Sequence, residues 1–423
     1  MRTRTRPILA ETPKRPTVVA IYCPLWHSYP HMDSWKGEGW TEWELLKTAP
    51  PRFEGHYQPL QPTWGCFDES DPKWAAKEID LAADHGIDVF LFDWYWYSGV
   101  KIMEEALESG FLQAPNRNRL RFALMWANHH WSDYFPAPFE GAWNSWLPMR
   151  HSLRDLNTVI DYCVDHYFCQ ANYWRVHDEL FFSIFQPELL IDHLGGAEKA
   201  RRAFQRIDRA LHARGLPSIH WNAMTKSAEH VPQFAAAGFA TTTSYNCITS
   251  GKAGPGTDLI DRYEDVVKAH RKLWRAMSND KCPYLPVVTT GWDVTPRCRH
   301  EVPWPFQPPK QMTEGHPFAE HNPKGKLCYP YIQVAVGNTP ARFGRLCHDA
   351  AQHLRETESK HPVVFLNAWN EWTEGAYLLP EKRYGDGYLK AVRSAFGLPI
   401  RKTRLGTRPF VGRPVSRSFK LGG

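Results

Sequence analysis

HPVVFLNAWNEWTEGAYLLP, residues 361–380, is the stretch from which we infer the fold. Residues 363–369 form an unbroken apolar and β-branched run of strand length, which is typical of a strand buried on both faces. The run ends in a polar, acidic turn that carries Glu371 and Glu374 among tryptophans. Strands buried on both faces occur in parallel sheets that are covered by helices, so this stretch favours an α/β fold.

Glu371 and Glu374 are the first candidates for chemistry. An apolar rim raises the pKa of a carboxyl group, and a second carboxylate nearby pushes the two pKa values apart. A protonated carboxyl beside an ionised one can perform general acid–base catalysis on an acetal. The alternative is that both glutamates begin a helix and offset its dipole. We expect Glu371 and Glu374 to be catalytic.

Eight apolar runs of strand length alternate with helical or loop sequence. They cover residues 18–23, 87–94, 120–127, 180–185, 218–223, 239–245, 285–290 and 363–369. Helix signals begin at Asp71-Pro72 and at Ser152, and longer helices are expected over residues 197–214, 258–277 and 340–358. Because a parallel strand needs a crossover to reach the next one, this alternation predicts a single (β/α)8 TIM barrel. An open, doubly wound sheet is the alternative.

Composition and charge narrow the class of protein. The 423 residues are 43% hydrophobic, and the net charge of +6 is concentrated at the two ends. We therefore expect a disordered basic arm (residues 1–16), a barrel (17–398) and a basic, loosely ordered tail (399–423). The near-neutral centre argues against nucleic acid as a partner. Nine cysteines without a C-x-x-C pair argue against a disulfide framework. With no signal segment or membrane span, we expect a cytoplasmic location.

Barrel enzymes carry their chemistry on the loops that follow the strands, and here these loops are long and aromatic. Five aromatic residues are candidates to stack on sugar rings: Trp26, Tyr95, Trp126, Trp292 and Trp372. Further candidate substrate contacts are His27, Glu42, Asp93, Asn128, His129, Asn222, Tyr245, Asp293 and Asn370. The alternative for the polar residues is that they cap helices or satisfy loop backbone. The Pro-rich loop after the seventh strand, ending near Asn338, is expected to act as a lid.

Cofactor motifs are missing from the sequence. His27, Asp93, His129 and His130 have suitable ligand types for a metal, but their spacing matches no known ligand motif. We find no phosphate-binding glycine loop and no G-x-S-x-G nucleophile elbow, and the glycine-rich segment 251–256 is expected to be a flexible loop. We therefore expect neither a metal nor an organic cofactor.

Several motifs together carry a family resemblance. WTEW (residues 40–43), HYQP (56–59), WAN (126–128), GWDVTPR (291–297) and NAWNEWTEG (367–375) resemble the WbsX family. That family is often labelled as glycosyltransferases of polysaccharide loci, and it is similar to the family 99 glycoside hydrolases, the endo-α-mannosidases and endomannanases. The resemblance runs from about residue 18 to residue 397. It implies a (β/α)8 barrel without cofactors and an oligosaccharide or polysaccharide substrate.

The resemblance also implies roles for the two glutamates. Glu371 would assist the sugar 2-hydroxyl in attacking the anomeric carbon, and Glu374 would protonate the leaving oxygen and later activate water, with net retention. The sequence departs from the usual pattern at His129, where a glutamate is common, and at Asp93-Trp94, where Tyr-His is usual. Both departures lie at the expected barrel mouth, so they bear on the identity of the substrate more than on the class of reaction. A glycosyltransferase and a non-catalytic carbohydrate-binding barrel are the alternative functions.

Overall fold

A computed structural model describes residues 15–397, apart from residues 133, 134, 140–144, 249–258, 280, 308–326 and 328. Its centre is a sheet of parallel strands in the order β10-β9-β8-β4-β2-β1-β14-β12. The bounds are β1 (Thr17–Tyr22), β2 (Val89–Tyr97), β4 (Arg121–Trp126), β8 (Glu179–Ile184), β9 (Ile219–Met224), β10 (Thr241–Thr243), β12 (Val287–Thr289) and β14 (Val363–Asn367). Each of the eight apolar runs of the sequence contains or overlaps one of these strands.

Hydrogen bonds between the first and last strands of this order close the sheet. The Thr242 N–H donates to the Pro283 carbonyl at 2.9 Å, and the Leu285 N–H donates to the Thr242 carbonyl at 2.8 Å. These bonds join β10 to the segment that enters β12, in the parallel sense. The predicted (β/α)8 barrel is therefore confirmed, and the open doubly wound sheet is wrong.

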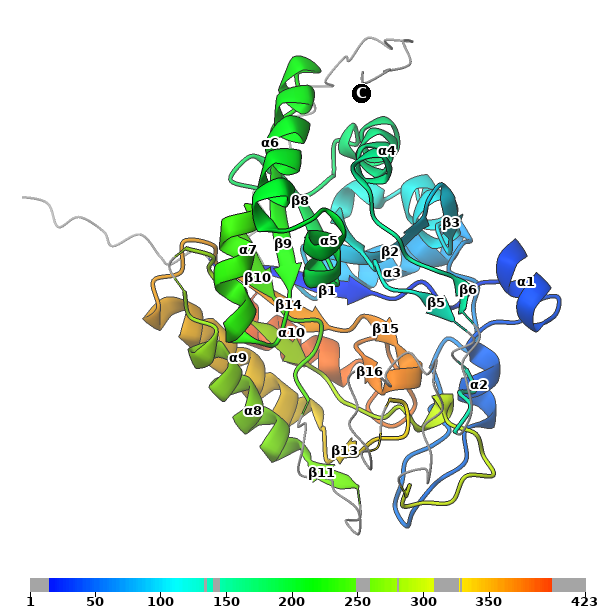
Figure 1. The fold of residues 1–423 in the computed structure, drawn as a ribbon. Helices are drawn as coiled ribbons and strands as arrows, with labels where there is room; N and C mark the ends of the chain where they lie inside the picture. The colour runs from blue at the N-terminus through cyan, green and yellow to red at the C-terminus, as the bar shows by residue number, and fades with distance from the viewer. Residues whose placement is uncertain are drawn as a thin grey trace, which may run out of the picture.

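Helices surround the barrel, and α8 lies beside α9 (Figure 1). The Asp71 and Ser152 side chains accept hydrogen bonds from backbone N–H groups at the starts of α3 and α4, as the sequence signals predicted. The helices are α1 (Pro30–Lys36), α2 (Trp43–Thr48), α3 (Pro72–Asp84), α4 (Leu153–Cys163), α5 (Pro187–His193), α6 (Ala197–Ala213), α7 (Val231–Ala237), α8 (Tyr263–Ala276), α9 (Pro340–Glu356) and α10 (Gly387–Phe396).

Helix α8 begins later than residue 258, where the sequence suggested its start. Residues just before it form the short strand β11 (Ile260–Arg262), which pairs in parallel with β13 (Val334–Val336). This pairing commits the backbone of β11 to an extended conformation, so the helix begins at Tyr263.

Short strands and single helical turns lie at the strand ends and in the loops. The strands are β3 (Val100–Ile102), β5 (Trp131–Ser132), β6 (Ser145–Leu147), β7 (Arg175–Val176), β15 (Asn370–Glu371) and β16 (Ala376–Tyr377). The single-turn π segments are η1 (Ala106–Gly110) and η4 (Val164–Phe168). The 3₁₀ turns are η2 (Phe111–Gln113), η3 (Arg117–Arg119), η5 (Ala228–His230), η6 (Thr295–Arg297) and η7 (Trp372–Glu374).

A second, smaller apolar cluster joins the long loops to one another. It contains Phe135, Cys298, Phe306 and Tyr331, from loops that follow different strands. The flanks of the expected lid therefore pack into this cluster, while residues 308–326 and 328 lie outside the described residues. The same holds for most of the expected basic arm, for the expected tail and for the glycine-rich segment 251–256.

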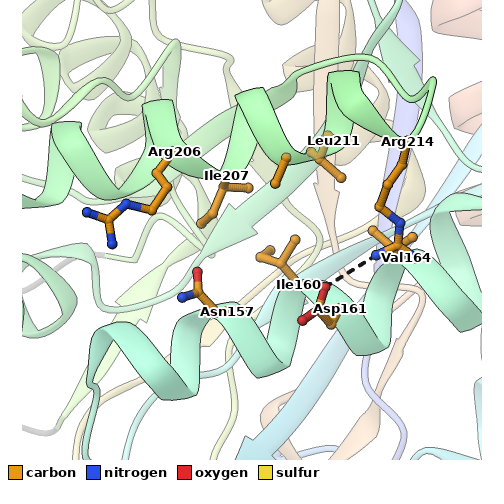
Figure 2. A pocket seen from close by; sticks show the side chains of 9 residues that line it. Asn157, Ile160, Asp161, Val164, Arg206, Ile207, Leu211 and Arg214 are labelled. Atoms are coloured by element: carbon orange, nitrogen blue, oxygen red, sulfur yellow. Dashed lines mark hydrogen bonds and ion pairs between the residues drawn. The ribbon is translucent and has the colours of Figure 1, made fainter. Parts of the chain in front are cut away.

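The helix layer carries a small groove between α4 and α6, of about 40 Å³ (Figure 2). Ile160, Ile207 and Leu211 line it, and the Arg214 guanidinium donates to the Asp161 carboxylate across one end at 3.3 Å. It contains none of the candidate site residues, so we treat it as a feature of helix packing.

Eight cysteines fall within the described residues, and all are free thiols. None of the described helices has both the length and the apolar character needed to cross a bilayer.

Candidate active site

The two glutamates lie on a tight turn at the carboxyl end of β14. Glu371 ends β15, and Glu374 ends the 3₁₀ turn η7, after which β16 returns antiparallel to β15. Gly375 closes the turn with φ of 65°, and a Cβ atom there would lie 2.8 Å from the Asp293 backbone nitrogen. Only glycine fits this position without displacement of the neighbouring loop. Both glutamates are buried, at 4% and 5% exposed.

Arg297 joins the two glutamates to the loop that follows β1. Its Nη1 lies 2.7 Å from Glu374 Oε1 and 3.6 Å from Glu371 Oε1, and its Nη2 lies 3.1 Å from Glu42 Oε2. The Tyr329 hydroxyl also donates to Glu374 Oε1, at 2.7 Å. The sequence analysis did not assign a role to Arg297 or Tyr329. The position of Arg297 inside the GWDVTPR motif was the available signal.

Tyr245 bridges two carboxyl groups at the barrel mouth. Its hydroxyl lies 2.8 Å from Glu371 Oε2 and 2.9 Å from Asp93 Oδ2. A hydroxyl has one proton to donate, so it cannot donate to two ionised carboxylates at once. One of the two carboxyl groups must therefore carry a proton and donate it to the tyrosine oxygen.

Three carboxyl groups, those of Glu42, Glu371 and Glu374, contact the guanidinium of Arg297, and Tyr245 links a fourth, that of Asp93, to Glu371. Burial raises the pKa of Glu371 well above its usual range, and the charges of Glu374 and Asp93 raise it further. Burial also raises the pKa of Asp93 well above its usual range, and it raises the pKa of Glu374 despite the opposing charge of Arg297. Burial and mutual repulsion therefore shift these carboxyl groups toward their protonated forms, in the direction that acid–base catalysis requires.

Several buried polar atoms at the mouth have no hydrogen-bond partner among the described residues. They include Glu374 Oε2, Asp93 Oδ1 and the indole nitrogen of Trp292. Buried polar atoms in proteins are normally hydrogen-bonded, so such atoms need an explanation. A ligand rich in hydroxyl groups would satisfy both the acceptors and the indole donor.

Three asparagines that were candidate substrate contacts are used by the protein itself. Asn128 accepts from the Gln186 N–H at 2.6 Å and donates to the Gln186 carbonyl at 2.9 Å. Asn222 bridges side chains of two neighbouring strands, and Asn370 accepts from the Cys23 N–H at 2.8 Å. For these residues the alternative reading, satisfaction of loop and strand groups, describes the observed contacts.

Asp293 anchors the HYQP segment to the loop after β12. Its Oδ2 accepts from His56 at 2.8 Å and from Gln58 at 2.7 Å, and its Oδ1 accepts from the Thr295 N–H and hydroxyl. Burial acts to raise the pKa of Asp293, but these hydrogen bonds outweigh it and hold the pKa below its usual value. The Asp293 backbone N–H donates to the Glu374 carbonyl at 2.7 Å, so this anchor also fixes the turn that carries Glu371 and Glu374.

The aromatic candidates are all buried in this structure. Trp26 packs on Trp43 at 4.3 Å between ring centroids, and Trp372 stacks on Tyr377 at 4.3 Å. Trp126 is fully buried. The described contacts of these three tryptophans support the site from behind. Tyr95 contacts the partly exposed His129 edge-on, at 5.9 Å between ring centroids.

His27 belongs to a buried network behind the turn that carries Glu371 and Glu374. Its Nδ1 lies 2.9 Å from Glu69 Oε1 and its Nε2 lies 3.3 Å from Glu105 Oε2. Glu69 also accepts from the amide of Asn370, which precedes Glu371. Burial lowers the pKa of His27, but its hydrogen bonds to Glu105 and Glu69 prevail and raise it to about 9. Within the described residues, no group of three or more His, Cys, Asp and Glu side chains is placed to hold a metal ion.

This raised pKa predicts a pH dependence of stability. Because the pKa of His27 is about 9 in the folded chain against an ordinary 6.5, its contribution is complete below pH 6.5 and is lost as the pH rises through 9. The loss amounts to about 3 kcal/mol. Chemical unfolding at pH 6 and pH 10 should show a smaller pH effect in His27→Gln than in wild type. The exposed control His348→Gln should behave as wild type, and an unchanged pH effect in His27→Gln would contradict the assignment.

The closed (β/α)8 barrel gives the chain a glycoside hydrolase-like fold. The chain belongs to the WbsX family, because the family model described as "Glycosyltransferase WbsX" matches residues 18–303 and 331–392. The predicted membership is thus confirmed.

Similar solved structures agree with this fold class. A "Glycoside hydrolase-like protein" has a TM-score of 0.58 at 13% identity, covering 93% of this chain and 97% of that chain. A family 99 endo-alpha-mannosidase from Bacteroides thetaiotaomicron, in complex with BIS-TRIS-propane, has a TM-score of 0.53 at 16% identity, covering 90% and 95%. At such identities the likeness concerns the fold alone.

Curated relatives include the "Uncharacterized protein WxcX" of two strains of Xanthomonas campestris pv. campestris. These are 28% identical over 393 residues and 29% identical over 389 residues, covering 90% of this chain and 49% of each relative. The chain therefore spans about half the length of the curated relatives it matches.

Proposed function

We propose that the chain cleaves a glycosidic bond in an oligosaccharide or polysaccharide as a retaining glycoside hydrolase, with Glu371 and Glu374 as the reacting carboxyl groups. The observation that carries this proposal is the pairing of both buried glutamates with one guanidinium at the barrel mouth. A carbohydrate-binding barrel without catalysis would not need several buried carboxyl groups with raised pKa values, because their burial costs stability.

Glu374 is the proposed acid. Its Oε1 is held by Arg297 and Tyr329, and its Oε2 has no partner among the described residues and can meet the leaving oxygen. The raised pKa keeps the proton available for the first step. Arg297 then stabilises the carboxylate that remains, and this carboxylate can accept a proton from the attacking water in the second step.

Glu371 is the proposed base. If Asp93 holds the proton of the Asp93–Tyr245–Glu371 chain, Tyr245 donates to Glu371 and Glu371 is ionised. Glu371 then takes the proton of the sugar 2-hydroxyl while the 2-oxygen of the sugar attacks the anomeric carbon. The bond to the leaving oxygen breaks, and that oxygen takes the proton of Glu374. Water next opens the anhydro sugar at the anomeric carbon, giving its proton to Glu374, while the 2-oxygen regains the proton from Glu371.

Two inversions at the anomeric carbon predict net retention. We expect the first-formed product to have the anomeric configuration of the substrate, and a 2-deoxy analogue to bind without being cleaved, because it lacks the attacking oxygen. Proton NMR of the first minutes of reaction distinguishes the two product anomers. An inverted product would contradict the participation of the 2-hydroxyl and would leave Glu371 without the proposed role.

Transfer from a nucleotide sugar is the rival activity, because the description of the family model names a glycosyltransferase. A transferase of that kind must bind a nucleoside diphosphate, whereas the proposed hydrolase has no use for one. The carboxyl groups around Arg297 favour hydrolysis, since a buried negative site disfavours a diphosphate close by.

A further inference from the structure

A cavity of about 140 Å³ lies beside the turn that carries Glu371 and Glu374. Gly375 is part of its described lining, whereas the Glu374 side chain is not. The lining also includes Asp293, whose backbone N–H donates to the Glu374 carbonyl at 2.7 Å. Loops from three parts of the chain complete the wall, including Tyr57, Trp292 and Arg383. A group bound in this cavity would therefore lie against Gly375, the residue that follows Glu374.

Two hydrogen-bond acceptors in the described lining, the Asp293 carboxylate and the Asn338 backbone carbonyl, are already occupied. Asp293 is the one carboxylate among the described residues that line the cavity, and it accepts four hydrogen bonds, from His56, Gln58 and Thr295. The Asn338 carbonyl accepts from the Tyr388 hydroxyl. The carboxylate of the described lining is therefore committed to partners within the chain, and the lining also carries hydrogen-bond donors.

Arg383 is a charged donor in this lining. Its guanidinium lies 4.8 Å from the Tyr57 ring centroid and 5.2 Å from the Tyr384 ring centroid. The nearby Glu381 carboxylate accepts instead from the Tyr57 hydroxyl at 2.8 Å and from the Arg383 and Tyr384 backbone N–H groups. The Arg383 guanidinium thus has no carboxylate partner among the described residues, and stacking on two tyrosines holds its planar set of donors in place.

Trp292 also lines the cavity. Its side chain is 4% exposed, and its indole nitrogen is buried without a hydrogen-bond partner among the described residues. An unsatisfied buried N–H costs free energy unless a ligand accepts from it. A guanidinium without a carboxylate partner among the described residues, held in the lining of a cavity, is suited to an anion.

We propose that this cavity binds an anionic substituent of the sugar substrate, a carboxylate or a phosphate ester, beside the scissile bond. The inference rests on the proposed function and narrows its substrate to acidic oligosaccharides or polysaccharides. A carboxylate or phosphate matches the planar guanidinium through paired hydrogen bonds.

Binding can be tested without turnover in the Glu374→Gln chain. We would titrate D-glucuronate, D-glucose 6-phosphate and D-glucose and follow binding by ligand-observed NMR. At least one charged probe should bind about tenfold more tightly than D-glucose, a preference that falls with added salt. The preference should disappear in Arg383→Gln and persist in Lys382→Gln, since the adjacent, exposed Lys382 is not part of the described lining.

The preferred charged probe identifies the anion. Equal affinity for all three probes, or an undiminished preference in an Arg383→Gln chain with an unchanged thermal unfolding midpoint, would overturn the proposal. Failure of the anion site can be distinguished from failure of the proposed hydrolysis. An anion preference that depends on Arg383 in a chain without hydrolytic activity would contradict hydrolysis alone, and hydrolysis without that preference would contradict the anion site alone.

Discussion

Glu374→Gln is expected to lower turnover of an unactivated glycoside by about 10²–10⁴, with sugar binding kept within a few fold, because it removes a positioned acid. The amide has nearly the shape of the carboxyl group and can still accept from Arg297 and Tyr329. Initial rates and ligand titrations on the same preparation measure the two effects separately.

The leaving group provides the control for this substitution. A glycosyl fluoride needs little protonation as its bond breaks, so Glu374→Gln should retain far more activity on a fluoride than on an alkyl glycoside. The substitution Glu44→Gln, at an exposed glutamate in α2, should leave both rates unchanged. Wild-type turnover of the alkyl glycoside by Glu374→Gln would end the assignment of Glu374 as the acid.

Arg297→Met should have the largest effect on stability. Arg297 is 4% exposed and is paired with Glu42 and Glu374, both of which are buried. Removing one partner of a buried ion pair leaves charge without compensation and costs about 3–5 kcal/mol of the free energy of unfolding. The methionine side chain fills similar volume, so the loss reports charge more than a cavity. Urea unfolding at neutral pH measures it.

The neighbouring Arg299 offers a matched control. Its side chain is 47% exposed, and its ion pair with Glu301 is 3.7 Å long at the surface. Arg299→Met should therefore change the free energy of unfolding by less than about 1 kcal/mol. If Arg297→Met were equally mild at neutral pH, the three carboxyl groups around the Arg297 guanidinium would not depend on it.

The fold was readable from the sequence because it depends on local patterns. Strands buried on both faces appear as apolar runs, and caps such as Asp71 and Ser152 mark helix starts. Strand ends were less predictable. The run at residues 239–245 contains only the strand Thr241–Thr243, because the chain then leaves the sheet and carries Tyr245 to the mouth.

The site was readable only in part, for a physical reason. Glu371 and Glu374 lie on one turn, so their spacing in the sequence predicts that they are close together. The structure also brings three other candidates to them: Tyr245 contacts Glu371 and Asp93, and Arg297 joins Glu42 to Glu374. The contact of Arg297 with Glu42 spans 255 positions, and no local pattern encodes such a contact.

The hydrogen-bond partners of polar residues inside strands could not be predicted, for a related reason. Asn222 reads as a free amide at the end of a strand, but its partners are Ser183 and Thr241, on the two adjacent strands. Those partners depend on the register of the barrel, which the sequence of one strand does not specify.

Release of new reducing ends tests most directly whether Glu371 and Glu374 hydrolyse a glycosidic bond. We would incubate wild type, Glu371→Gln and Glu374→Gln with α- and β-linked mannosides and glucosides and with neutral and acidic bacterial polysaccharides, and would quantify reducing ends over time. We expect wild type to release reducing ends from at least one substrate, and we expect the rate of release to fall by about 10²–10⁴ in each variant. Equal release by wild type and both variants, or no release by wild type together with micromolar binding of a nucleoside diphosphate, would contradict hydrolysis by these two glutamates.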